Sequence, residues 1–157
     1  VMDQADHKRI IDLITFTTNL EHAADIVDKS LMDLAGKKTK YGLKFSAEGS
    51  KEIEDIHRRL NDNVGLAMNV FMTGDLALAR KLFAEKQAFR ELERVASENH
   101  LQRLREGRME SMTTSGLHLD ILRDLKRINS HLAIMAQPRL EAAGELHPSR
   151  LKEEAPA

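Results

Sequence analysis

Three carboxylates close together in the N-terminal part of this sequence are its clearest candidates for chemistry. Glu21 and Asp25 are four residues apart, and Asp25 and Asp28 are three apart. On an α-helix these spacings put side chains on one face, where like charges repel by roughly 0.2–0.5 kcal/mol per pair. A nearby cation would relieve this repulsion. Three sources of that cation remain open: a divalent metal ion held by hard oxygen ligands, a lysine or arginine from another helix, or solvent with its salt.

The three carboxylates belong to a long amphipathic helix, which the sequence predicts over residues 6–35. Apolar or small residues recur at alternating spacings of three and four, a heptad pattern typical of helices that pack on other helices. They are Ile10, Leu13, Thr17, Leu20, Ala24, Val27, Leu31 and Leu34. Gly36 is a typical residue for the end of a helix, and Lys37 and Lys38 would face the negative end of the helix dipole.

Three more helices follow, each with its own apolar stripe and its own boundary signals. Ser46 is the predicted N-cap of the second helix, and the short turn at 73–75 reverses the chain into the third, with Asp75 as its cap. Caps at 111–115 begin the fourth, which Pro138 limits, although a last turn that tolerates proline could reach Glu141. The predicted fold is an all-α, antiparallel up-down bundle of four long helices. It forms one domain over 1–143, followed by a flexible tail at 144–157.

Composition excludes several classes of function. The 157 residues suit one domain, and a net charge of −1 gives no sign of a nucleic-acid surface. The absence of cysteine excludes disulfides and thiolate metal sites, and no apolar run reaches the roughly 20 residues that span a bilayer. No Gly-rich phosphate loop, nucleophile elbow or His-Glu-x-x-His motif is present, so we predict no enzymatic activity. Without an anion nest or clustered arginines, no direct phosphate site is expected either.

Two segments resemble a known family. Leu20-Glu21-His22-Ala23-Ala24-Asp25 resembles the Glu-Arg-x-x-Asp helix of PhoU, a bacterial phosphate-signalling protein built from two three-helix repeats. The segment 124–131 stands where the second copy of that motif would fall. More specifically, residues 117–131 resemble the PhoU-like cytoplasmic domain at the C-terminus of bacterial sodium/phosphate cotransporters. The resemblance covers roughly residues 6–141.

The resemblance implies a function and partners. The chain would be the regulatory, cytosolic PhoU-like domain of a sodium-dependent phosphate transporter, at the cytoplasmic face of the bacterial inner membrane. Its partner would be the transmembrane part of the parent transporter. A homo-oligomer is expected as well, because one helix taken from a six-helix architecture leaves apolar surface that a second copy could cover. The alternatives are a free-standing PhoU-like regulator of phosphate signalling and, less favoured, a carboxylate metal-binding bundle.

The resemblance also bears on the carboxylates. Proteins of the PhoU type bind metal clusters through paired carboxylate motifs, so Glu21, Asp25 and Asp28 are candidate ligands for a divalent ion. In this sequence, however, Lys126 and Ser130 stand where PhoU has carboxylates in its second motif. We therefore expect Lys126 or Arg127 to lie near Glu21 or Asp25 as an ion-pair partner, in place of a metal.

Overall fold

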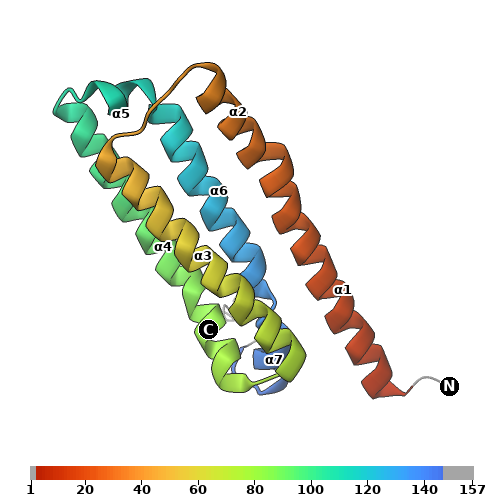
Figure 1. Ribbon diagram of the computed structural model, residues 1–157. Coiled ribbons are helices and arrows are strands. Elements are labelled where there is room, and N and C mark those ends of the chain that lie inside the picture. Colours follow the sequence, from red (N-terminus) through yellow and green to blue (C-terminus); the bar gives the residue numbers. More distant parts are fainter. Residues whose placement is uncertain (1–2, 147–157) are drawn as a thin grey trace, which may run out of the picture.

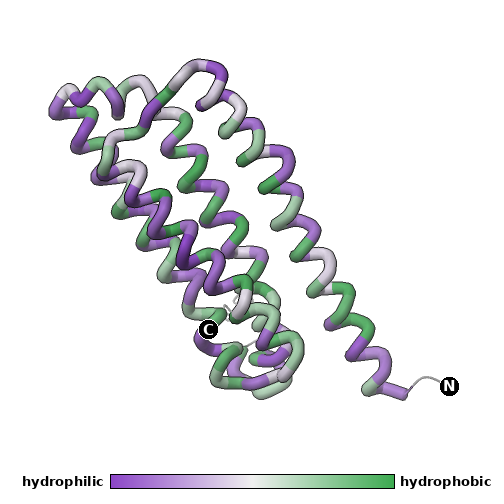
Figure 2. Tube along the Cα trace, in the orientation of Figure 1, coloured by the Kyte–Doolittle hydropathy of each residue, from purple (hydrophilic) through white to green (hydrophobic). Residues whose placement is uncertain are grey.

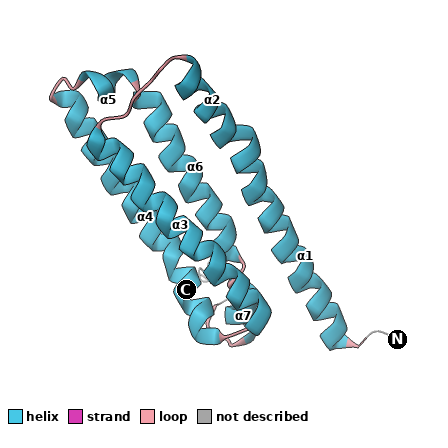
Figure 3. Ribbon diagram, viewed as in Figure 1, coloured by secondary structure: helices cyan, strands magenta, loops and turns pink. Residues whose placement is uncertain are grey.

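The computed structural model describes residues 3–146 as an antiparallel bundle of long helices joined by short links (Figure 1). No strand occurs in this range (Figure 3), and none of its helices is long and apolar enough to cross a membrane. The all-α prediction is confirmed. The elements are α1 (Gln4–Asp25), the π-helix η1 (Ile26–Leu31), α2 (Met32–Lys40), α3 (Ala47–Thr73), α4 (Leu76–Arg105), α5 (Met109–Thr113), α6 (Ser115–Ile134) and α7 (Gln137–Ala142).

Local signals place the reversal between α3 and α4 as predicted. The Ser46 hydroxyl accepts a hydrogen bond from the Gly49 amide at 3.1 Å, and the Asp75 carboxylate accepts one from the Leu78 amide at 2.8 Å. These contacts satisfy amide groups that the first turn of a helix leaves without partners. Between the two helices, Gly74 adopts a left-handed conformation with φ 63°, which costs glycine little.

Two predicted boundaries are wrong. The first helix does not end at Gly36 but continues through α2 to Lys40, because a glycine inside a helix costs only about 1 kcal/mol. The chain turns instead at Gly42, where φ is 58°. Pro138 does not simply end the fourth helix, since α6 already ends at Ile134. The proline lies in the first turn of α7, where its missing N–H costs nothing.

Helix α6 lies at the centre of the bundle and packs against α1, α3 and α4. The sequence predicts an apolar stripe on this helix at Leu117, Ile121, Leu125, Ile128, Leu132 and Met135. This prediction is confirmed, because five of the six are buried and Ile121 packs partly buried against the core. Facing residues from α3 and α4 complete this core, among them Ile56, Leu60, Ala67, Leu82, Phe89 and Ala96.

The predicted stripe of the first helix is only partly right. Its last members, Leu31 and Leu34, pack inward as expected, whereas its members on α1 are exposed. In the structure α1 and η1 bury Phe16, Ala23 and Ile26 against the bundle. Leu13 and Leu20, two members of the predicted stripe, are 49% and 40% exposed. Figure 2 shows the apolar residues along α1. The reason is that α1 packs mainly on one neighbour, α6, so only a narrow side of the helix is buried. The predicted heptad face of α1 lies outside this contact and is exposed to solvent.

The beginning of the predicted tail contacts the bundle. Glu145 forms an ion pair with Arg80 of α4, and Leu146 packs partly buried against the core. The rest of the predicted tail, residues 147–157, lies outside the described residues.

Candidate functional site

A hollow opens between the first helix and α6, next to the candidate carboxylates. We call it the η1–α6 hollow. Its lining combines imidazoles, cations and one carboxylate with one apolar side chain, that of Ile26. The lining residues are His22, Asp25, Ile26, Lys29, Ser30, Arg127 and His131.

The π-helix η1 shapes one wall of this hollow. A π-helix is rare, and π segments inside longer α-helices are frequent at functional sites. Here the Ser30 hydroxyl donates a hydrogen bond to Asp124 of α6. Asp124 is only 3% exposed, and it also accepts from Arg127 Nη1 at 3.2 Å. A buried carboxylate needs hydrogen-bond donors, and Ser30 and Arg127 supply two. The Ser30 bond also ties η1 to α6 at this point.

A chain of hydrogen bonds orients His131 on the α6 wall. Asn19 donates through Nδ2 to the Thr15 carbonyl at 2.9 Å, so its Oδ1 is the acceptor for His131 Nδ1 at 3.0 Å. Nδ1 of the neutral ring therefore carries the proton, and Nε2 has a free lone pair. The ring meets His22 edge to face, with centroids 5.2 Å apart. Burial lowers the pKa of His131, and the nearby His22 and Arg127 lower it further.

The structure separates the predicted carboxylates. Glu21 and Asp28 are exposed and form no side-chain hydrogen bond or ion pair within residues 3–146. Asp25 alone lines the hollow, and it pairs with Lys29 one turn along its own helix at 3.2 Å. The sequence placed all three on one face but could not show that only Asp25 would line the hollow beside α6.

The expected ion pairs between helices are replaced by others. Lys126 does not meet Glu21 or Asp25; it bonds Glu93 of α4 at 2.7 Å, because it lies on the flank of α6 that faces α4. Arg127 does share the hollow with Asp25, but its carboxylate partner is Asp124, three residues before it on α6.

The residues present do not fit the metal cluster that the resemblance implied. Within residues 3–146, no three His, Asp or Glu side chains gather closely enough to hold a metal ion. Lys126 and Ser130 stand where the second PhoU motif has carboxylates, and neither can serve as a ligand here. The Ser130 hydroxyl donates to the Lys126 carbonyl, and the Lys126 ammonium pairs with Glu93 of α4. The hollow also contains two cationic side chains, Lys29 and Arg127, which would repel a metal ion.

Sequence reasoning missed the role of Asp124 and Ser30. One signal was available: Asp124 lies between Ile121, Leu125 and Ile128 on α6, so it was bound to lie near the core boundary. A carboxylate there needs donors. Nothing in the sequence indicated Ser30, because its direction depends on the π-helical turn.

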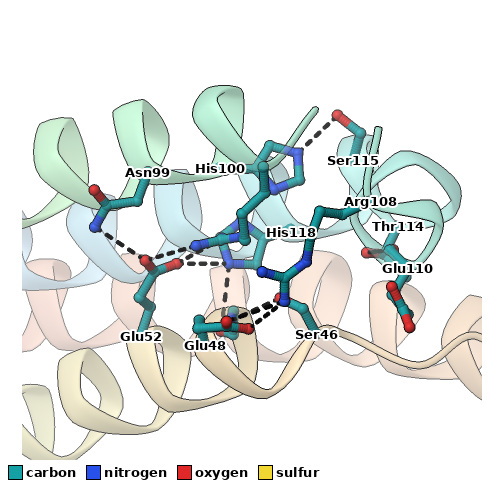
Figure 4. A network of polar contacts seen from close by, with 12 residues as sticks. Ser46, Glu48, Glu52, Asn99, His100, Arg108, Glu110, Thr114, Ser115 and His118 are labelled. Atoms are coloured by element: carbon teal, nitrogen blue, oxygen red, sulfur yellow. Dashed lines mark hydrogen bonds and ion pairs between the residues drawn. The ribbon is translucent and has the colours of Figure 1, made fainter. Parts of the chain in front are cut away.

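A second polar cluster lies at the other end of the bundle, where α3, α4 and α6 meet (Figure 4). Arg103 donates two hydrogen bonds to Glu52, at 3.0 and 2.9 Å, and His118 Nε2 lies 3.4 Å from the same carboxylate. Burial alone would raise the pKa of Glu52, but the hydrogen bonds from His118, Arg103 and Asn99 outweigh it and lower the pKa to about 2. This cluster joins three helices through buried charges.

Two stacked histidines complete the cluster. His100 and His118 are almost fully buried, and their ring centroids are 4.8 Å apart. His100 bonds Ser115 at 2.9 Å, while the Nδ1 atoms of both rings lack a partner within the described residues. Burial lowers the pKa of His100, and the neighbouring His118 and Arg103 add to the effect. The arrangement favours a neutral ring at this position and serves a structural role.

Comparison of the sequence with known proteins identifies its family. The family model described as PhoU domain matches residues 53–138, more than half of the chain. YjbB of Escherichia coli K12, a proposed inorganic phosphate export protein, is 37% identical over 142 residues, which cover 90% of this chain. Its counterpart in Salmonella typhimurium is 38% identical over 136 residues.

The chain spans about a quarter of the length of these curated relatives: 26% of the first and 25% of the second. No solved structure matched the chain. The helical bundle, the two PhoU-like segments and the family match agree, and the chain belongs to the PhoU domain family.

Proposed function

We propose that this chain is a non-enzymatic regulatory domain that controls the movement of phosphate across the bacterial inner membrane from its cytoplasmic face. The observation that carries the proposal is the similarity over 90% of the chain to relatives named for phosphate export. The family match to the PhoU domain supports the same role. Control would arise if the domain's contact with a transport protein had two arrangements that an effector could shift.

Two arrangements of the polypeptide would deliver this control. The domain could act as a separate PhoU-like regulator that docks on a transport protein, or as one part of a sodium-dependent phosphate transporter whose membrane-spanning part is its partner. The separate regulator is supported by the match to the PhoU domain, which covers more than half of the chain. The fused arrangement is supported by the relatives, which are about four times as long as the matched region.

A genetic experiment in the source bacterium tests the proposal. The segment encoding residues 3–146 is deleted in frame, and the release of radiolabelled phosphate is measured after a shift from low to high external phosphate. The expected result is a changed rate of release, restored when the segment is returned to its locus. An unchanged rate and an unchanged internal phosphate level would contradict a role in phosphate movement. Supplying residues 1–157 from a second locus separates the arrangements, since only a separate regulator would act in that form.

A further inference from the structure

The η1–α6 hollow has a lining that the regulatory role does not yet use. Lys29 and Arg127 bring two positive charges, and His22 and His131 bring two imidazoles. Asp25 also lines the hollow, and Arg127 forms an ion pair with the buried Asp124. The lining therefore offers a ligand both cationic hydrogen-bond donors and hydrogen-bond acceptors in the same hollow. Building on the proposed function, we propose that this hollow binds a phosphate group, with free inorganic phosphate as the ligand.

The cationic donors are available to a ligand. Among the contacts of residues 3–146, Arg127 reaches Asp124 through Nη1, which leaves its Nε and Nη2 hydrogens for another acceptor. A guanidinium offers these hydrogens in a planar fork that matches phosphate oxygens. Lys29 is 71% exposed, and its bond to Asp25 is an i,i+4 pair of the kind that contributes little to stability. Its ammonium group can therefore turn toward an anion at low cost.

The acceptors favour phosphate over other tetrahedral anions. At neutral pH inorganic phosphate keeps at least one P–OH group, which can donate a hydrogen bond. Asp25 and the unprotonated Nε2 of His131 can accept from it, given that Nδ1 of His131 is the protonated nitrogen. Sulfate carries no proton at this pH and would set its charge against the Asp25 carboxylate. A site that hydrogen-bonds a ligand's O–H group discriminates strongly against an analogue that lacks the group.

The placement of the hollow connects binding to the fold. Its walls come from η1 and α6, and the Ser30–Asp124 hydrogen bond already ties these two elements together. An anion held between Lys29 on η1 and Arg127 on α6 would add a second tie across the same gap. Phosphate would then bind more tightly to the arrangement in which the first helix is docked on α6 than to one in which it is not. A regulatory ligand needs such a difference in affinity between two arrangements.

Calorimetric titration of the whole chain at pH 7 tests the proposal directly, with inorganic phosphate, sulfate and glycerol 3-phosphate as ligands. Phosphate should bind, and sulfate should bind at least about tenfold more weakly. The absence of phosphate binding, or equal affinity for sulfate, would overturn the proposal. Tighter binding of glycerol 3-phosphate would overturn free phosphate as the source of the phosphate group.

Matched variants locate the site. Lys29→Gln and Arg127→Gln should each weaken phosphate binding by about tenfold, the loss expected for one charge-assisted hydrogen bond. The controls are Lys37→Gln, which removes the equivalent lysine of the exposed Asp33 pair on α2, and Arg123→Gln, which removes the arginine of the Asp120 pair on α6. Both controls should bind as the unmodified chain does. Equal losses in variants and controls would show non-specific attraction and would contradict the site.

Two safeguards keep the result decisive. Arg127→Gln removes a donor from a buried carboxylate and can lower stability, whereas Lys29 is exposed, so Lys29→Gln alone is sufficient to test the site. The proposed function fails separately from this inference. Phosphate binding with an unchanged release of phosphate in the deletion strain would contradict the regulatory role. A changed release without phosphate binding would contradict only the hollow.

Discussion

At the scale of single residues, the buried polar groups determine how this bundle responds to pH. His100 has a lowered pKa because burial and nearby positive groups disfavour its protonated form. A lowered histidine pKa means that the unfolded chain binds more protons than the folded chain once the pH falls below about 6.5. Stability should therefore decrease as the pH falls from about 6.5 toward the pKa of the folded state.

The first prediction concerns this dependence. His100→Gln should flatten the fall in unfolding free energy between pH 6.5 and 5, because a single titrating histidine contributes up to about 1.4 kcal/mol per pH unit. Urea unfolding at several pH values measures the slope. His57→Gln, at an exposed position on α3, is the control and should leave the slope in place. An unchanged slope in the His100 variant would show that other groups carry the acid sensitivity.

A second prediction tests the bond between η1 and α6. Ser30→Ala removes a hydroxyl donor from Asp124, which is 3% exposed. Hydrogen bonds to charged groups contribute about 1.5–3 kcal/mol, so the free energy of unfolding should fall by about that amount. Ser50→Ala, which removes a hydroxyl donor from the exposed Glu54, should cost much less. Equal effects would show that the Asp124 carboxylate finds another donor, such as water.

At the scale of elements, a polar network inside the apolar core sets how α3, α4 and α6 fit together. Asn129 is fully buried on α6; it accepts from Asn63 of α3 at 2.9 Å and donates to the Glu85 carbonyl of α4 at 3.1 Å. Glu85 in turn receives two bonds from Arg59. A buried polar contact of this kind is satisfied in one register of the helices, so it specifies that register.

The third prediction follows from this network. Asn129→Leu should lower the free energy of unfolding by about 1–3 kcal/mol, because the Asn63 amide and the Glu85 carbonyl lose a partner in a buried place. Chemical unfolding followed by circular dichroism measures the change. Asn61→Leu, at an exposed position on α3, should have little effect. A more stable Asn129 variant would show that apolar packing outweighs the network here.

At the scale of the whole molecule, the outward stripe of α1 is an apolar surface that no other described helix covers. Ile10, Leu13, Leu20 and Val27 keep heptad spacing and are each at least 40% exposed. Such a stripe is typical of a seam between two helices. A second copy of the chain is the proposed occupant, because a two-fold axis would set the same stripe against itself and cover both.

The fourth prediction is therefore self-association. Sedimentation at roughly 50 μM, a concentration that populates even micromolar complexes, should show a dimer. Leu13→Glu combined with Leu20→Glu should convert it to a monomer, because charge at the seam opposes burial. Leu101→Glu, at an equally exposed site on α4, should leave the dimer intact. A monomer for the unmodified chain would contradict the proposed use of this stripe.

The sequence by itself determined the fold class and most helix boundaries. Heptad spacing, the Ser46 and Asp75 caps and the turn at Gly74 are local signals, and local hydrogen bonding and helix geometry decide them. The α6 stripe was also predictable. Because α6 contacts α1, α3 and α4, its apolar residues meet a neighbouring helix on several sides. The two PhoU-like segments carried the family, and the family model confirmed it.

Only the tertiary structure decided what the functional groups face. The first helix carries apolar residues on more than one face, so the sequence does not show which face is buried. In the packing of α1 on α6, Phe16 and Ala23 are buried and Leu13 and Leu20 are exposed. The π-helical turn that aims Ser30 at Asp124 has no signature in the sequence. Lys126 pairs with Glu93 because of its position on α6 relative to α4. Contacts between residues far apart in sequence depend on the rotation and register of each helix, and packing of the whole bundle fixes both.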